Sequence, residues 1–250
     1  MKITATIQAR MSSERLPGKV LKLISGKPIL EWQIDRIRKS KLIDEIVVAT
    51  TNNSTDKQII DFCKAKNVKY YIGSENDVLA RINNAFFSTK SDIHVELYGD
   101  SPFVDPSLID VYIGYFLKNY NKIDVLTNSL KTTYPPGNEF FIYKKKCLEY
   151  ANNNTDKNDP LREHVSQNII NKKFKVHNVE AKGVFYRPNL FLEIDTINDF
   201  EMLNKLIPIV IHKRGIDFSL KDIIDVSIME KSITEQNKNV HRRWTKYRKE

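Results

Sequence analysis

The segment IQARMSSERLPGKV, residues 7–20, places three cations in one loop-like stretch after a short apolar alternation. These cations are Arg10, Arg15 and Lys19, with Ser12, Ser13 and Gly18 between them. A guanidinium offers a planar fork of donors to phosphate oxygens, and an ammonium offers a compact charge. The serine hydroxyls and the backbone N–H groups around the glycine could add hydrogen bonds. The stretch is therefore able to hold a triphosphate, although charge alone favours a solvated loop. It matches neither the Walker phosphate loop nor the dinucleotide glycine fingerprint.

Two aspartates at the ends of expected strands are candidate Mg²⁺ ligands. Asp100 closes the apolar segment IHVELYGD at 93–100, and Asp195 ends another apolar stretch just before a helix. A carboxylate buried at a strand end is costly unless it is paired. Mg²⁺ usually takes one or two carboxylates together with phosphate oxygens of a substrate. Each aspartate could instead cap the helix that follows, and Asp105, before Pro106, is assigned to such a cap.

The segment GSENDVLAR, residues 73–81, lies between an expected strand and an expected helix. Ser74, Asp77 and Arg81 could contact the base or the ribose of a nucleotide there, together with Glu75. Ser74 followed by an acid three residues later is also typical of a capping box at a helix start. The two interpretations are compatible.

No arrangement for nucleophilic catalysis is evident in the sequence. The histidine with the most informative surroundings is His164, in LREHV beside Arg162. This pair could contact an acceptor or a partner subunit, and a structural role in a helix is equally open.

Alternating strand and helix patterns predict how these residues are positioned. Strands are expected at 2–8, 44–51, 68–72, 93–100, 124–127, 175–179 and 190–194, with one more after the Pro-Pro-Gly turn of TYPPGNEFFIY. Helices are expected at 28–39, 54–66, 75–88, 106–119, 159–173, from about 196, and at 219–230. Such repetition predicts an α/β protein with a mainly parallel sheet between two layers of helices. These sheets bind ligands at the carboxyl ends of their strands. The loop with the cations and the Gly99-Asp100 turn should therefore share one cleft.

Composition bounds the class of protein. The chain has 250 residues, of which 41% are hydrophobic and 28% are charged, as in ordinary globular proteins. We expect one domain over 1–230, with a less regular acceptor or dimer region at 130–185, a polar loop at 152–159 and a basic tail at 231–250. No apolar run reaches membrane-spanning length and the amino terminus does not resemble a signal peptide. Cys63 and Cys147 are interpreted as reduced thiols, and a cytoplasmic location without membrane contact is expected.

The positive charge is concentrated at the carboxyl terminus. Five of the nine net charges lie in residues 231–250, with Trp244 and Tyr247 among the cations. Such a tail could touch nucleic acid, but a solvated terminal helix or a frayed end is favoured, and no nucleic-acid partner is expected. The remaining positive excess suits a small anionic substrate.

Six segments together resemble a known family. ARMSSERLPGK, from Ala9 to Lys19, is similar to the A-R-x-x-S-x-R-L-P-x-K signature of the bacterial cytidylyltransferases, which include the CMP-KDO and CMP-acylneuraminate synthetases. GSENDVLAR, YGDSPFVDP, YPPG, LREHV and IDTINDF follow in the order of the SpsF-like branch, which is named for spore-coat polysaccharide synthesis. The resemblance spans residues 2–205.

The resemblance implies a nucleotide-diphospho-sugar transferase fold, Rossmann-like in its sheet, and usually a homodimer. It implies transfer of CMP from CTP to a sugar acid, with release of pyrophosphate. Carried over, the nucleotide-binding positions are Ala9, Arg10, Ser12, Ser13, Arg15 and Lys19, with Ser74, Asp77 and Arg81 lining the nucleotide pocket. Asp100 and Asp195 would hold Mg²⁺, and Arg10, Arg15, Lys19 and Asp100 would carry the catalysis.

Departures from the family pattern fall on the presumed acceptor side. Glu139 keeps one of two acids that often follow the YPxG turn, and Phe141 replaces the other. Phe191 stands where a basic residue is frequent. The acceptor is therefore left open among a nonulosonic acid, a deoxyoctulosonic acid and a phosphorylated polyol. The alternatives considered are a glycosyltransferase of related fold, disfavoured because DSPFVD is not a DxD motif, and a non-catalytic binder of nucleic acid.

Overall fold

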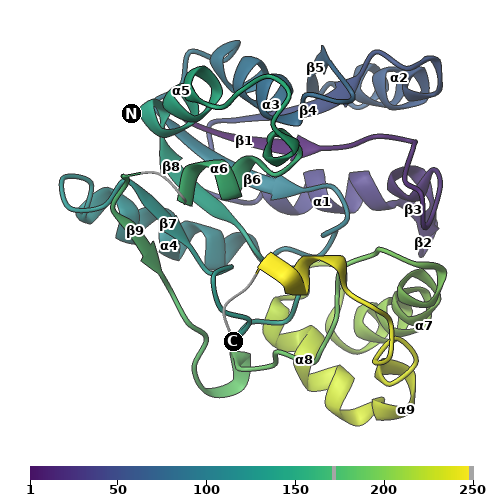
Figure 1. Ribbon diagram of the computed structural model, residues 1–250. Helices are drawn as coiled ribbons and strands as arrows, with labels where there is room; N and C mark the ends of the chain where they lie inside the picture. The colour runs from purple at the N-terminus through teal and green to yellow at the C-terminus, as the bar shows by residue number, and fades with distance from the viewer. Residues whose placement is uncertain (171–172, 248–250) are drawn as a thin grey trace.

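The computed structural model describes residues 1–170 and 173–247, without the side chains of residues 246 and 247. Within those ranges one large sheet has the strand order β5-β4-β1-β6-β8-β7-β9 (Figure 1). Its strands are β1 (Ile3–Gln8), β4 (Glu45–Thr51), β5 (Lys69–Gly73), β6 (Ile93–Tyr98), β7 (Val125–Thr127), β8 (Phe141–Lys144) and β9 (Val176–Asn178). All neighbouring pairs are parallel except those of β8, which is antiparallel to β6 and β7. The predicted mainly parallel α/β sheet is confirmed.

Helices cover both faces of this sheet, as predicted. One face carries α1 (Ile29–Ile37), α2 (Lys57–Ala65) and α4 (Pro106–Lys118), whose apolar residues join those of the central strands in one buried cluster. The other face carries α3 (Val78–Phe87), α5 (Lys145–Asn154) and α6 (Val165–Ile170) in a second cluster. Both cysteines are buried and free.

A third layer of core lies below the sheet edge in Figure 1. The long helix α7 (Ile197–Arg214) packs there against α8 (Leu220–Met229), and Trp32 of α1 joins the same apolar cluster as Phe103 and Phe218. The helix starts expected near Thr196 and Ser219 are confirmed, because each residue closes a capping box with an aspartate three positions later. No helix in the described residues is long and apolar enough to cross a membrane.

The strand predicted at 190–194 is wrong. This segment pairs with no strand of the described residues and makes isolated backbone bonds to two different loops: Leu192 N–H donates to Pro136 O at 2.7 Å, and Ile194 N–H donates to Asp100 O at 2.8 Å. Its apolar residues are buried by the α7–α8 layer rather than by a neighbouring strand. An apolar alternation alone could not distinguish these two surroundings.

Two predictions in the middle of the chain also need correction. The helix expected at 159–173 is broken at His164 into a 3₁₀ turn, η3 (Pro160–Glu163), and α6, and residues 171 and 172 lie outside the described part. The polar loop expected at 152–159 begins later, because α5 continues to Asn154 with Cys147, Leu148 and Ala151 buried on one face. The sequence reading also missed a short hairpin of β2 (Leu23–Ile24) and β3 (Lys27–Pro28).

Two glycines let backbone segments approach closely at the carboxyl ends of the central strands. A Cβ atom on Gly99 would lie 2.1 Å from the carbonyl oxygen of Gln8 at the end of β1. Gly137 has a φ of +101°, and a Cβ atom there would lie 2.5 Å from the amide nitrogen of Glu193. Side chains at either position would force these segments apart. The glycines thus hold the ends of β1 and β6 and the 193–195 segment in one place.

Candidate functional site

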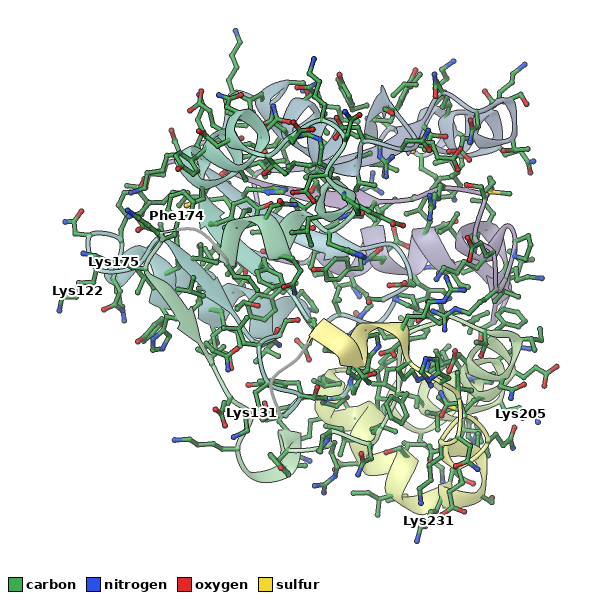
Figure 2. The ribbon with its side chains drawn as sticks, viewed as in Figure 1. Lys122, Lys131, Phe174, Lys175, Lys205 and Lys231 are labelled. Atoms are coloured by element: carbon green, nitrogen blue, oxygen red, sulfur yellow. The ribbon has the colours of Figure 1, made fainter. Side chains whose placement is uncertain are left out.

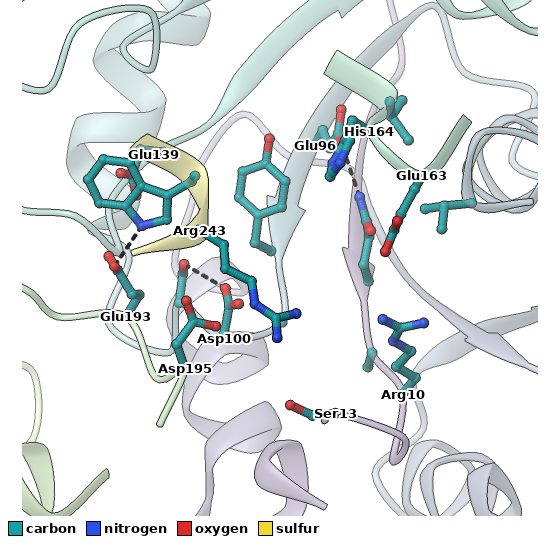
Figure 3. Close-up of a pocket in the computed structure, with 18 of the residues that line it drawn as sticks. Arg10, Ser13, Glu96, Asp100, Glu139, Glu163, His164, Glu193, Asp195 and Arg243 are labelled. Atoms are coloured by element: carbon teal, nitrogen blue, oxygen red, sulfur yellow. Dashed lines mark hydrogen bonds between the residues drawn. The ribbon is translucent and has the colours of Figure 1, made fainter. Parts of the chain in front are cut away.

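A pocket of about 430 Å³ opens at the carboxyl ends of β1 and β6. Its walls come from the end of β1, the 13–20 loop, the end of β6, the 163–167 turn, the 193–195 segment and the carboxyl-terminal residues 243 and 244. Figure 3 shows Asp100, Asp195 and Arg243 between two sides, with Glu139 and Glu193 on one and Arg10 and Glu96 on the other. The cleft expected from the strand order therefore exists, and segments from both halves of the chain form it.

Asp100 and Asp195 meet at Lys19. The lysine Nζ lies 3.1 Å from Asp100 Oδ2 and 3.2 Å from Asp195 Oδ1, and it donates to Ile194 O at 2.6 Å. Arg15 Nη2 lies 2.8 Å from the other oxygen of Asp195. The backbone bond between Ile194 and Asp100 brings the two aspartates to the same point. The predicted convergence of the cationic loop with both carboxylates is confirmed in geometry.

The charges at this point are only partly compensated. Burial raises the pKa of Asp100; the charge of Lys19 opposes this rise, and the charges of Asp195 and Glu139 add to it. Burial and the charge of Glu139 likewise raise the pKa of Glu193 well above its usual range. Burial by itself would lower the pKa of Lys19, but the charges of Asp100 and Asp195 raise it above its ordinary value. The cluster therefore favours additional positive charge.

The donor set fits a divalent cation held jointly with a substrate. In the described residues no group of three or more histidine, cysteine, aspartate or glutamate side chains is arranged to hold a metal by itself. Two carboxylates that share one lysine at the pocket wall match the preference of Mg²⁺ for a few carboxylates plus phosphate oxygens. Asp100 keeps 30% of its side chain exposed, toward the pocket.

Most residues of the predicted phosphate loop line the pocket, but Ser12 does not. Ala9, Arg10, Ser13, Arg15 and Lys19 line the pocket. Ser12 instead hydrogen-bonds Glu75, which also accepts from Asn53 and lies 3.8 Å from Arg10 Nη1. Lys19 is only 9% exposed and is occupied by the aspartates, so its charge acts on the carboxylates as well as on any bound phosphate.

The 73–81 segment has a mainly structural arrangement. Arg81 lines the pocket and bonds the carbonyl of Ser74. Ser74 and Asp77 lie outside the pocket lining: the Ser74 hydroxyl accepts from Asp77 N–H at 3.1 Å, and Asp77 caps Ala80 N–H at 2.9 Å. The capping interpretation therefore describes these two side chains.

Of the two residues singled out in LREHV, His164 lines the pocket and Arg162 does not. His164 lines the pocket with its neighbour Glu163. Arg162 is 4% exposed and turns away, with its Nε 2.9 Å from Asp77 Oδ1 and its Nη1 donating to Thr155 O. Arg162 thus joins α3 to the 155–163 region and does not face a ligand.

Sequence reasoning missed Glu96, which is buried in the middle of β6 and lines the pocket floor. Its carboxylate accepts from Gln8 Nε2 at 2.9 Å and from the Tyr143 hydroxyl at 3.1 Å. Burial raises the pKa of Glu96 to about 7, and the two hydrogen bonds oppose the shift. The sequence could have identified Glu96, because a glutamate between apolar strand residues is expected to be buried and then needs hydrogen-bond partners.

Glu96 predicts a pH dependence of stability. Its pKa in the folded protein is above the ordinary 4.5. The unfolding free energy is therefore highest below that pH and falls as the pH rises to about 7. We expect Glu96→Gln to remove a drop of about 2–3 kcal/mol in unfolding free energy between pH 5 and pH 8. Urea unfolding at both pH values measures it. The exposed control Glu149→Gln should keep the wild-type drop, and an unchanged drop in Glu96→Gln would exclude Glu96 as its source.

The carboxyl-terminal residues were expected to be solvated, and this is wrong for Arg242, which is buried, and for Trp244, which is partly buried. Arg242 is 4% exposed and its Nη2 lies 2.7 Å from Asp199 Oδ1. Arg243 and Trp244 line the pocket, and the Trp244 indole N–H donates to Glu193 at 2.8 Å. The side chain of Tyr247 and residues 248–250 lie outside the described part. Elsewhere the cations are dispersed, and Figure 2 shows Lys122, Lys131, Lys205 and Lys231 extending from different sides of the molecule.

The sequence and the fold are similar to those of known proteins. Residues 4–240 match the family model described as Cytidylyltransferase. The spore coat polysaccharide biosynthesis protein SpsF of Bacillus subtilis is 32% identical over 80% of this chain and 84% of its own length. A solved cytidylyltransferase of Leptospira borgpetersenii superposes with a TM-score of 0.87 at 32% identity, covering 97% of this chain and 100% of that one.

A more distant solved structure has the same fold. It is a CMP:2-keto-3-deoxy-manno-octonic acid synthetase complexed with CTP, with a TM-score of 0.63 at 17% identity, covering 83% of this chain and 99% of that one. The nucleotide-diphospho-sugar transferase fold inferred from the motifs is thereby confirmed.

Proposed function

The chain belongs to the cytidylyltransferase family and is an enzyme of that class, and from this premise we propose that it transfers CMP from CTP to a sugar acid or a sugar or polyol phosphate. Pyrophosphate is the second product, and the cytidylylated compound is a precursor of a surface polysaccharide. The likeness to a spore coat polysaccharide protein supports the polysaccharide context, and the CTP of the octonic acid synthetase supports the nucleotide. The observation that carries the proposal is the meeting of Asp100, Asp195 and Lys19 beside the Arg10–Arg15 loop.

In the proposed reaction an acceptor oxygen attacks the α-phosphorus in line. The new bond joins that oxygen to phosphorus, and the bond from the α-phosphorus to the bridging oxygen of the β-phosphate breaks. Arg10, Arg15 and the hydroxyl of Ser13 bind phosphate oxygens and offset the charge on the departing pyrophosphate. The enzyme forms no covalent intermediate, so its own task is to align the reactants and to balance their charge.

Asp100 and Asp195 would hold Mg²⁺ against the triphosphate, where the cation supplies charge neutralisation of the phosphate oxygens. Lys19 keeps the two carboxylates together and orients their oxygens toward the pocket. We also expect the enzyme to act as a homodimer in the cytoplasm. Sedimentation at assay concentrations tests the dimer.

A pyrophosphate-release screen tests the function. Four nucleoside triphosphates are combined with a panel of nonulosonic acids, deoxyoctulosonic acid and polyol phosphates, with and without Mg²⁺. We expect release with CTP, with one acceptor class and only with the divalent cation. Equal release from all four triphosphates would contradict the cytidylyl preference. Sugar transfer from a nucleotide sugar, without any triphosphate reaction, would favour the glycosyltransferase alternative.

A further inference from the structure

The carboxyl-terminal segment, residues 237–244, returns to the pocket after α9 (Lys231–Thr234) and is fixed at its base. In Figure 1 it runs from the α7–α8 layer toward the sheet edge. Asn237 is fully buried and donates to Asp199 Oδ1 at 2.9 Å and to Phe191 O at 3.1 Å. The guanidinium of Arg242 lies 4.4 Å from the ring centre of Phe191 and pairs with Asp199. Arg242 Nη1 also lies 3.4 Å from Glu193 Oε1, so this buried guanidinium faces two carboxylates.

The anchor presents two side chains to the pocket. Arg243 extends between the aspartates and the Arg10 side in Figure 3, and its Nη1 lies 2.9 Å from Glu14 Oε2. The arginine side chain is 60% exposed and the glutamate side chain 73% exposed. Such an exposed pair contributes little stability, so a ligand anion can take the place of Glu14. Trp244 is held against Glu193 by its indole N–H.

The two sides of the pocket differ in chemistry. The side with Arg10 and Ser13 offers cations and a hydroxyl to phosphates. The opposite side offers Glu139 and Glu193, whose carboxyl groups can accept hydrogen bonds from sugar hydroxyls, and the indole of Trp244, which can cover the apolar face of a sugar ring. Hydroxyl groups of a polyhydroxylated molecule can donate to these carboxyl groups, whereas the oxygens of an ionised triphosphate carry no proton to donate.

We propose that the carboxyl-terminal segment forms the acceptor subsite, in which Arg243 binds the anionic group of a polyhydroxylated acceptor and Trp244 with Glu193 faces its carbon skeleton. This inference rests on the proposed function. Arg242 is a positioning residue, because it joins this segment to Asp199 and so to the helix start that follows Asp195. Asp199 therefore holds both the acceptor subsite and the backbone of Asp195, one of the two proposed metal ligands.

Steady-state kinetics of Arg243→Gln tests the subsite. We expect the KM for the acceptor to rise about tenfold to a hundredfold, because a charge-assisted bond is lost, while the KM for CTP changes less than about twofold. The matched control is Lys238→Gln, which removes one cation from an exposed position of the same segment outside the pocket lining. It should leave both KM values unchanged. A rise confined to CTP, or no change in either constant, would overturn the inference.

The panel also identifies the anion. A sugar acid presents a carboxylate to the guanidinium of Arg243, and a polyol phosphate presents a phosphate. The acceptor class is the one whose compounds are turned over and whose KM rises in Arg243→Gln. Trp244→Phe keeps a ring but removes the bond to Glu193. It should raise the acceptor KM without changing the midpoint of thermal unfolding by more than a few degrees.

A binding measurement separates failure of the subsite from failure of the proposed function. The chain has two tryptophans, and Trp32 is 2% exposed, so acrylamide quenching reports mainly on Trp244. Sugar acids or polyol phosphates should protect wild-type fluorescence, and neutral sugars and Arg243→Gln should give no protection. If no panel compound turns over but protection is seen, the proposed reaction fails and the subsite stands. Absence of protection by every anion overturns the subsite.

Discussion

Asp100→Asn is expected to lower kcat for pyrophosphate release from CTP roughly a hundredfold to a thousandfold, the usual effect of losing one strong electrostatic contact to a transition state. Asparagine has the shape of aspartate but contributes no charge to a divalent cation between positions 100 and 195. Measured as a function of Mg²⁺ concentration, the variant should also need more of the cation for half-maximal activity.

The same substitution should not weaken the fold. Burial raises the pKa of Asp100 and, with the charges of Asp195 and Glu139, outweighs the opposing charge of Lys19, so the ionised carboxylate is disfavoured in the folded protein. Removing that charge relieves the repulsion, and Lys19 keeps its bonds to Asp195 and Ile194. Unfolding free energy at pH 8 should therefore equal or exceed that of the wild type. Asp225→Asn, on α8 and outside the pocket lining, is the control for a simple change in net charge. Full turnover by Asp100→Asn would remove this residue from the metal site.

The strand order explains why much of the site was predictable. Arg10 follows β1 and Asp100 follows β6, and these strands are parallel neighbours, so their carboxyl ends must lie together. The periodicity of the segments is enough to place both residues at one edge. Asp195 was predicted from a motif and from a strand that does not exist. Its position depends on backbone bonds between Ile194 and Asp100 and on the close approach at Gly137, which a pattern of residue types does not encode.

The carboxyl-terminal part of the site was not predictable for a related reason. A basic segment near a chain end has the composition of a solvated tail. What fixes it is the pairing of Arg242 with Asp199, two residues far apart in the sequence, in a place where Phe191 offers a ring to the guanidinium. The opposite error was to assign nucleotide contacts to Ser12, Ser74 and Asp77, which hold loops in place. The family signature includes residues that shape the loops as well as residues that line the pocket.

Lys19→Met tests whether Lys19 occupies the place of a cation in the metal-free enzyme. Its ammonium is the shared partner of Asp100 and Asp195. Removing one partner of a buried pair typically destabilises a protein by about 3–5 kcal/mol. In EDTA we expect a loss of that order in unfolding free energy at pH 8. The loss should shrink at low pH, because protonation of the two carboxyl groups removes the need for a counter-charge.

Addition of Mg²⁺ should then distinguish a metal site from an ordinary ion pair. We expect millimolar Mg²⁺ to restore part of the stability of Lys19→Met, since the divalent cation replaces the missing charge between the aspartates. The matched control is Lys144→Met, which breaks another buried pair, 2.9 Å from Nζ to Asp124 Oδ1, away from the pocket. That variant should have the same stability with and without Mg²⁺, because Asp124 keeps Lys146 as a partner at 2.8 Å. Equal responses of the two variants to Mg²⁺, measured by urea unfolding, would mean that Asp100 and Asp195 hold Lys19 for structural reasons alone.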